Sequence, residues 1–323
     1  MKKIVIWGST GSLGRQVLEV LENYTRDFQI VAISGKTNAG LLNEQAQKYH
    51  VKRAFIGENT LPPNADIVVN LLSGTAGIRP TKTALKSGKA LLLANKESLV
   101  AEGEEIMRLC KTPIIPIDSE HNAIYEILRQ NPGKEIEKII LPCSGGPFHG
   151  LKDLSPVTVE QALHHPRWQM GPKITIESAT LINKGLEIIE AFYLFNLPLN
   201  KIEVKIHPEC QIHGMVKFIN EAQPIAYLAP PDMKEHLENA LLRSIDKAPK
   251  RTIRPLLPNE FQLGEPNHSL LPGIKIVLNY FQKNPHKMKE FLQNEELQIQ
   301  KFLNKEVDFL TLLSSLELFG QNS

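Results

Sequence analysis

Two carboxylates and an imidazole stand side by side at the end of an apolar run. The segment "PIIPIDSEHNAI" places Asp118, Ser119, Glu120 and His121 directly after "PIIPI". If the strand continues through them, Asp118 and Glu120 point to the same side, because residues i and i+2 of a strand share a face. Alternatively, Asp118 or Ser119 caps a helix over "EHNAIYEIL", whose N-terminus acidic side chains stabilise. This segment alone leaves both interpretations open.

A third carboxylate comes from a segment that is dense in polar side chains. The stretch "SATLINKGLE" contains Ser178, Thr180, Asn183, Lys184 and Glu187 on what becomes an apolar helix. A glycine in the same stretch, Gly185, costs a helix about 1 kcal/mol, which favours a site over a plain helix. Three carboxylates without a Cys or His cluster are typical of a hard oxygen-ligand site for Mg²⁺ or Mn²⁺.

Three glycines stand between the first apolar run and the first helical pattern. Gly8, Gly11 and Gly14 have the spacing G-x-x-G-x-x-G, a variant of the dinucleotide fingerprint, in the expected strand-turn-helix context. A plain helix-entry turn is the alternative. The second predicted strand, "QIVAIS", is followed by "GKTN", which offers a lysine and no acid. This favours NADP over NAD, although a solvated turn lysine has the same appearance.

Two further segments have the composition of ligand-binding loops. In "LPCSGGPF", Ser144 and two glycines follow a strand, where backbone N–H groups and a hydroxyl can bind an anion, as they can in an ordinary turn. In "HHPRWQMGPK", Trp168 and Met170 occupy a non-periodic stretch with two prolines. A mobile lid and a buried corner are both compatible with this second pattern.

The candidate residues must be positioned by the strands and helices around them. Up to residue 118, short apolar runs alternate with helical patterns, which predicts a parallel sheet covered by helices. Only "ENTLPPNA" separates the predicted strands "RAFIG" and "DIVVN", too little for a crossover helix. From residue 119 to about residue 239, strands of a mixed sheet, interspersed with helices, are predicted by the runs "EKIILP", "KITIES", "KIEVKIHP", "GMVKFIN" and "PIAYLA".

The predicted fold is therefore α/β with three domains. A Rossmann-like sheet domain covers 1–118, an α+β domain with a mixed sheet covers 119–239, a Pro-rich linker covers 240–267, and a small helical domain covers 268–323.

Composition excludes several classes of function. The chain has 323 residues and a net charge of +2, so no overall field attracts nucleic acid or a membrane surface. Its 3 cysteines are widely spaced, which indicates neither disulfides nor zinc and suits a reducing compartment. The first apolar run, "IVIW", is too short for a signal peptide, and no run approaches the roughly 20 residues of a membrane helix. We expect a cytoplasmic protein.

Seven segments in order resemble the 1-deoxy-D-xylulose 5-phosphate reductoisomerase family: "GSTGSLG", "LLANKESLV", "IDSEHNAI", "SGGPF", "HPRWQMG", "SATLINKGLE" and "IHPECQIHGMV". The resemblance implies a homodimer that uses NADPH and Mg²⁺ or Mn²⁺ to rearrange and reduce a sugar phosphate, 1-deoxy-D-xylulose 5-phosphate, to 2-C-methyl-D-erythritol 4-phosphate in isoprenoid synthesis. It also implies the cofactor-binding residues, which would be Thr10, Gly11, Ser12, Leu13, Gly35, Lys36, Thr37, Asn95, Glu97 and Gly171. An Asn is the more familiar residue where Thr37 stands, so Thr37 or Asn38 would contact the 2′-phosphate.

The same resemblance implies the metal and substrate residues. Asp118, Glu120 and Glu187 would hold the metal, and Lys96 would assist proton movement. The substrate would be bound by Lys96, Ser119, Glu120, Ser144, His165, Trp168, Ser178, Asn183, Lys184 and Glu187. The two histidines of "IHPECQIH", His207 and His213, match the family's pattern, and we take them as structural or as supports for residues that contact the ligands. Two alternatives remain: a non-catalytic NADPH-binding homologue, and another NADP-dependent oxidoreductase, such as a semialdehyde dehydrogenase that uses Cys143.

Overall fold

A computed structural model describes residues 1–168 and 170–322. Contacts between residues divide the chain into two compact units. The first unit contains 1–98, 103–125 and 232–250, and the second contains 99–102, 126–231 and 251–323. The predicted boundaries at 118, 239 and 267 stay predictions.

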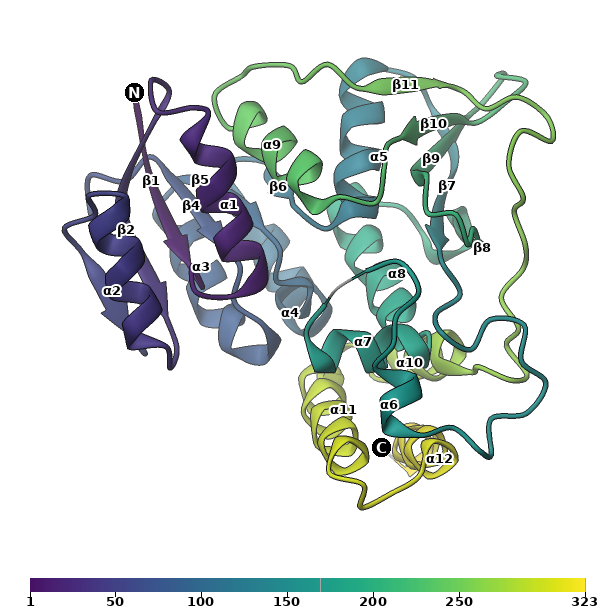
Figure 1. The fold of residues 1–323 in the computed structure, drawn as a ribbon. Helices are drawn as coiled ribbons and strands as arrows, with labels where there is room; N and C mark the ends of the chain where they lie inside the picture. The colour runs from purple at the N-terminus through teal and green to yellow at the C-terminus, as the bar shows by residue number, and fades with distance from the viewer. Residues whose placement is uncertain (169, 323) are drawn as a thin grey trace. The chain divides into compact units, whose positions relative to one another are not determined.

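A six-stranded parallel sheet forms the first unit, in the order β3-β2-β1-β4-β5-β6 (Figure 1). This is the doubly wound order of dinucleotide-binding folds. The strands are β1 Lys2–Trp7, β2 Phe28–Gly35, β3 Ala54–Ile56, β4 Ile67–Asn70, β5 Ala90–Leu93 and β6 Ile114–Pro116. No helix intervenes between β3 and β4, as the sequence predicts. All four residues of β4 are buried, which explains why the first three are apolar, and the buried Asn70 amide donates to the Gly77 carbonyl and the Thr81 hydroxyl.

Helices of the first unit are α1 Ser12–Glu22, α2 Ala39–Lys48, α3 Ile78–Lys86, α4 Lys96–Leu109, the start of α5 Ser119–Gln130, and α9 Met233–Arg243. Although α9 is remote in sequence, it lies beside α1 (Figure 1). Leu237, Ala240 and Leu241 of α9 join the same apolar core as Ile4 and Ile117. The end of β6 is therefore packed against α9.

The second unit contains a mixed sheet and the remaining helices (Figure 1). The sheet order is β11-β10-β9-β7-β8, with only β7 and β8 parallel. The strands are β7 Ile136–Cys143, β8 Ile202–Ile206, β9 Ile212–Phe218, β10 Ile225–Leu228 and β11 Thr252–Pro255. The helices are α6 Val159–Ala162, α7 Pro172–Ala179, α8 Ile182–Phe195, α10 Gly273–Lys283, α11 Met288–Leu303 and α12 Phe309–Asn322. The three terminal helices agree with the prediction.

One predicted strand is wrong. The run "KITIES" is not a strand but lies inside α7. Gly171 and Pro172 start this helix, and the Thr175 hydroxyl donates to the Gly171 carbonyl at 2.9 Å. Proline is favoured in a first helical turn, and packing of the buried Ile176 outweighs the weak preference of β-branched residues for strands.

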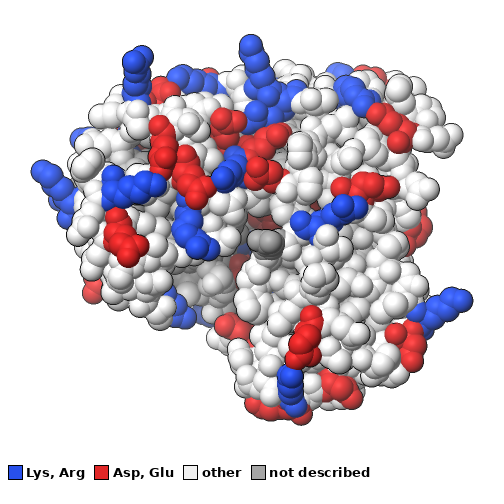
Figure 2. All heavy atoms as spheres, viewed as in Figure 1, with Lys and Arg blue, Asp and Glu red and all other residues white. Residues whose placement is uncertain are grey.

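Charge and hydropathy agree with the composition. Figure 2 shows basic and acidic side chains interspersed over the face that is drawn. Among the described residues, no helix has the length and apolar character that a membrane span requires.

Candidate active site

The junction between β6 and α5 presents the first two predicted metal ligands. The strand ends at Pro116 and the helix begins at Ser119, so the strand does not continue through Asp118 and Glu120. The backbone N–H of Asn122 donates to the Asp118 carbonyl at 2.8 Å, and Glu120 lies in the first helical turn. The strand interpretation is thus wrong, and the acids lie at a helix N-terminus, where negative charge is favoured.

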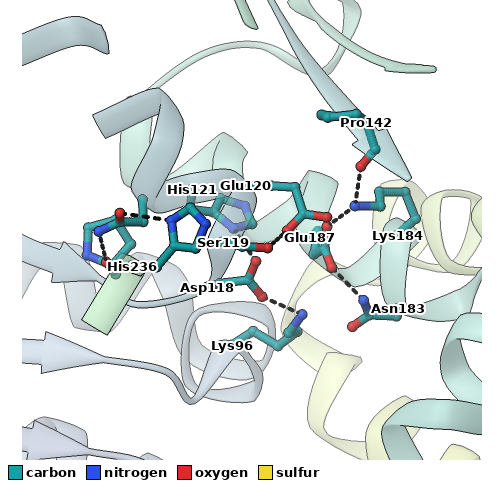
Figure 3. A network of polar contacts seen from close by, with 12 residues as sticks. Lys96, Asp118, Ser119, Glu120, His121, Pro142, Asn183, Lys184, Glu187 and His236 are labelled. Atoms are coloured by element: carbon teal, nitrogen blue, oxygen red, sulfur yellow. Dashed lines mark hydrogen bonds and ion pairs between the residues drawn. The ribbon is translucent and has the colours of Figure 1, made fainter. Parts of the chain in front are cut away.

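Two basic side chains lie beside the Asp118 carboxylate (Figure 3). Lys96 Nζ lies 2.6 Å from Oδ2, and His121 Nδ1 lies 3.4 Å from Oδ1. Burial acts to raise the pKa of Asp118, but Lys96 and His121 overcome it and hold that pKa well below the usual range. The Ser119 hydroxyl donates to the Glu120 carboxylate. Asp118 is therefore an anion at neutral pH, which is the state a cation requires.

The glycine turn after β1 leaves the N-terminus of α1 open. Gly8 has φ +87°, and a Cβ on Gly14 would lie 2.3 Å from the Gly8 carbonyl oxygen. Gly11 is the N-cap residue of α1, and no side chain of the described residues caps the helix. Gly11 N–H donates to the Gly8 carbonyl at 3.1 Å. Among the predicted residues Thr10, Gly11, Ser12 and Leu13, the last two therefore offer backbone N–H groups of the first turn of α1 to an anion such as a pyrophosphate.

The turn after β2 approaches the glycine turn. A Cβ on Gly35 would lie 2.9 Å from Thr10 Oγ1, so the two segments predicted to bind the cofactor are adjacent. Lys36 and Thr37 are exposed, whereas the Asn38 side chain caps α2 by accepting from Leu41 N–H at 3.0 Å.

Asn95 and Glu97 hold the loop after β4. The Asn95 amide donates to the carbonyl groups of Leu72 and Gly74, each at 2.9 Å, and Glu97 Oε1 accepts from Gly74 N–H at 2.7 Å. Both residues lie at the carboxyl edge of the parallel sheet, the edge at which ligands bind in such folds.

In the second unit, the turn after β7 collects donors around Ser144. Gly145 and Gly146 have φ +85° and +71°, which favours glycine. Ser144 Oγ accepts from Gly146 N–H at 3.1 Å, and a Cβ on Gly146 would lie 2.9 Å from the Ser178 carbonyl oxygen. The predicted residues Ser144 and Ser178 are thus on neighbouring segments.

His165 completes this polar cluster. Its Nε2 lies 3.1 Å from Ser144 Oγ, while its Nδ1 accepts from the backbone N–H groups of Arg167 and Trp168 at 3.2 and 3.0 Å. Partial burial lowers the pKa of His165 to about 4. The neutral ring therefore has its proton on Nε2 and donates it to Ser144.

Trp168 and Gly171 lie in the segment between His165 and α7. The half-buried Trp168 ring meets His213 edge-on, with 6.2 Å between ring centroids. Gly171 is the exposed N-cap residue of α7.

Glu187 is held by two neighbours on α8 (Figure 3). Asn183 and Lys184 both donate to its carboxylate, and Lys184 Nζ also donates to the Pro142 carbonyl of β7 at 2.8 Å. Lys184 and Glu187 are both almost fully buried. The reason for a glycine at position 185 differs from the one expected. A Cβ there would lie 2.8 Å from Val277 Cβ. The close approach of α10 to α8 requires this glycine, so it is no signal of a site.

Helix α9 carries two buried polar residues that were not predicted from the sequence. His236 Nδ1 and Asn239 Nδ2 lie 3.1 and 2.9 Å from Asn122 Oδ1. The available signal was a pair of polar residues, spaced i and i+3, on a helix that is otherwise apolar on its buried side.

Comparisons with known proteins identify the family. A family model described as 1-deoxy-D-xylulose 5-phosphate reductoisomerase matches residues 4–63 and 60–103, and the model of its C-terminal domain matches residues 114–195. A protein of that name from Caldanaerobacter subterraneus subsp. tengcongensis is 44% identical, over 75% of this chain and 71% of its own. One from Lachnoclostridium phytofermentans is 37% identical over 100% of this chain and 91% of its own.

Solved structures lead to the same family. A crystal structure of DOX-P reductoisomerase in complex with NADPH, fosmidomycin and magnesium has a TM-score of 0.87 at 28% identity, covering 98% of this chain and 88% of that one. The enzyme from Zymomonas mobilis in complex with NADPH has a TM-score of 0.85 at 28% identity, over 100% and 92% of the two chains. These matches confirm the resemblance: the chain belongs to the 1-deoxy-D-xylulose 5-phosphate reductoisomerase family.

Proposed function

We propose that this chain is the enzyme that converts 1-deoxy-D-xylulose 5-phosphate to 2-C-methyl-D-erythritol 4-phosphate, with NADPH and a divalent cation, in isoprenoid precursor biosynthesis. The observation that carries the proposal is membership of the family over nearly the full length of a relative, 91% of it in one case. A non-catalytic homologue is not favoured, because Lys96, Asp118, Glu120 and Glu187 all keep side chains that suit the chemistry.

The glycine turn supports the proposed NADPH site. Related enzymes are known in complex with NADPH. In this chain, Gly14 lets α1 pack closely against the backbone of Gly8 and Ser9, and the open N-terminus of the helix fits a pyrophosphate. We assign Thr10, Gly11, Ser12 and Leu13 to that group, Gly35, Lys36 and Thr37 to the 2′-phosphate, and Asn95, Glu97 and Gly171 to the rest of the cofactor.

Oxygen donors support the proposed cation site. We assign the cation to Asp118, Glu120 and Glu187, because carboxylates without thiolates suit Mg²⁺. The depressed pKa of Asp118, caused by Lys96 and His121 against the effect of burial, fits a ligand that stays ionised. Mg²⁺ is present in a related structure, and we propose that Mn²⁺ can replace it.

When bound, the cation polarises the oxygens of the substrate carbonyl and its neighbouring hydroxyl, and NADPH supplies the hydride that reduces the rearranged aldehyde. The protein's own residues orient the substrate and move protons. Lys96, whose Nζ lies 2.6 Å from Asp118 Oδ2, is assigned to exchange a proton with a substrate hydroxyl. Ser119 and Glu120 are assigned to bind the substrate beside it.

Ser144, His165, Ser178, Asn183 and Lys184 are assigned to the substrate phosphate. His165 donates to Ser144 Oγ and Gly146 N–H does so too, so the hydroxyl proton of Ser144 is left to donate to a phosphate oxygen. Phosphate binding supplies energy remote from the reacting carbons. Trp168 is assigned to a lid that excludes water.

The decisive assay follows NADPH absorbance with purified protein. We expect oxidation that requires both 1-deoxy-D-xylulose 5-phosphate and Mg²⁺ or Mn²⁺, and that NADH supports poorly. Turnover without added cation in the presence of a chelator would contradict the metal site, and no turnover with all components present would contradict the function. We also propose a cytoplasmic homodimer, which sedimentation of the purified protein and fractionation of cells would test.

A further inference from the structure

The amide of Asn122 links the end of β6 to α9. Its Nδ2 lies 2.9 Å from the carbonyl oxygen of Pro116, the last residue of β6. Because a carbonyl only accepts, the nitrogen of the amide must face Pro116 and the oxygen must face α9. The backbone N–H of the same residue donates to the Asp118 carbonyl at 2.8 Å. Asn122 therefore fixes both ends of the turn that presents Asp118.

Two side chains of α9 fix Asn122 in turn. His236 Nδ1 and Asn239 Nδ2 lie 3.1 and 2.9 Å from Asn122 Oδ1, and since that oxygen accepts, both must donate. All three residues are completely buried. A buried amide without partners is costly, so apolar residues at 236 and 239 would leave Asn122 Oδ1 unsatisfied and free the amide to turn.

The apolar contacts of α9 are separate from this polar group. Leu237, Ala240 and Leu241 pack in the core of the first unit, and they would dock the helix whatever stood at 236 and 239. Purely structural packing does not need the two donors, whereas a fixed orientation of the β6–α5 turn does.

We propose that His236 and Asn239 are positioning residues for the cation site, acting through Asn122 on Asp118 and Glu120. The inference rests on the proposed function, in which these carboxylates hold the cation. Outer partners of metal ligands change metal affinity by about 10-fold to 100-fold when they are removed. Because His236 and Asn239 act through one intervening residue, we expect the low end of that range.

The test uses Mn²⁺ alone as a probe, with free Mn²⁺ measured by electron paramagnetic resonance on the full-length protein. His236→Leu and Asn239→Leu are expected to raise the Mn²⁺ dissociation constant about tenfold. The dissociation constant of NADPH should change less than twofold. His236→Asn keeps a donor near the position of Nδ1 and is expected to restore most of the Mn²⁺ affinity.

A matched control on the same helix separates positioning from stability. Leu241→Ala removes core packing and lowers the melting temperature, but it leaves the donors in place and should leave Mn²⁺ affinity unchanged in the folded protein. Equal losses of affinity in Leu241→Ala and His236→Leu would overturn the inference, as would normal affinity in both donor variants.

Asp118→Asn separates failure of the inference from failure of the proposed function. If the unaltered protein binds Mn²⁺, Asp118→Asn does not, and His236→Leu and Asn239→Leu bind it normally, only the positioning role is wrong. If Asp118→Asn binds Mn²⁺ as tightly as the unaltered protein, or if neither binds it, the assigned cation site fails and the inference falls with it.

Discussion

Nε2 of His165 and Oγ of Ser144 are 3.1 Å apart, and the backbone behind the imidazole decides which atom donates. Since Nδ1 accepts from two N–H groups, the ring of neutral His165 is a donor toward Ser144. Partial burial lowers the pKa of His165 to about 4, so this arrangement persists at neutral pH.

Replacing His165 tests the proposed phosphate site. His165→Ala should raise KM for 1-deoxy-D-xylulose 5-phosphate by about tenfold, because removing one partner of the buried Ser144 hydroxyl costs about 1–3 kcal/mol. His165→Gln retains a donor near Nε2 and should recover part of the loss, as measured by NADPH oxidation. The neighbouring exposed His164 is the control, and His164→Ala should be neutral. An effect of His165→Ala on KM for NADPH alone would contradict the assignment.

Substitutions of the buried pair Lys184 and Glu187 should have non-additive effects on the free energy of unfolding. Lys184→Met leaves a buried carboxylate without its cation, a loss that typically costs about 3–5 kcal/mol. Lys184→Met/Glu187→Met should recover at least about 1 kcal/mol of that loss while remaining inactive, as measured by guanidinium unfolding without added cation. The partly exposed pair Lys138 and Glu203, at 2.8 Å, is the control, and its coupling should lie within about 1 kcal/mol. Strict additivity at Lys184 and Glu187 would contradict the buried pairing.

Gly14 predicts a steric effect on the cofactor turn. In Gly14→Ala, the new Cβ would meet two backbone oxygens, those of Gly8 and Ser9, at 2.3 and 2.4 Å. Such overpacking costs about 1–3 kcal/mol, and we expect KM for NADPH to rise about tenfold with a lower melting temperature. Gly40→Ala is the control, because Cβ there would lie 3.8 Å from its only neighbour within 4 Å among the described residues. A normal KM for NADPH in Gly14→Ala would argue against an NADPH site at this turn.

Sequence patterns were informative where one physical cause dominates. The buried run "IVVN" and the glycine turn after β1 identified the parallel sheet, because both faces of such a strand must be apolar and a Cβ on Gly14 does not fit. They failed at "KITIES", where alternation of apolar residues suits a strand and a helix equally until packing decides.

Long-range contacts explain what the sequence did not reveal about the site. A glycine is required at position 185 because α10, almost a hundred residues later in the chain, packs against it. The side chain of Asn122 is held by His236 and Asn239. Residue types suggested the candidate ligands, but neither composition nor spacing contains the contact that orients them. The assignment of Asp118 as a metal ligand consequently stays a prediction that the Mn²⁺ titration tests.

Glu295, which lies outside the candidate site, should make the stability of the protein depend on pH. It is fully buried on α11, its Oε2 lies 3.0 Å from Lys173 Nζ, and the same lysine pairs with Glu177 on α7. Burial, and next the charge of Glu177, raise the pKa of Glu295 well above the usual value. A carboxyl with a raised pKa in the folded state contributes stability fully below its unfolded pKa of about 4.3 and loses it as pH rises through the folded pKa.

Glu295→Gln cannot ionise, so it should lose less stability than the unaltered protein as pH rises from 5 toward 9. We expect the difference in melting temperature to grow in favour of the variant by about 3 °C, equivalent to about 1 kcal/mol for a domain of this size. Glu296→Gln, at the neighbouring exposed position, should follow the unaltered protein at every pH. Parallel curves for Glu295→Gln and the unaltered protein, or a gap that widens toward acid, would show that Glu295 is already ionised in the folded state at low pH.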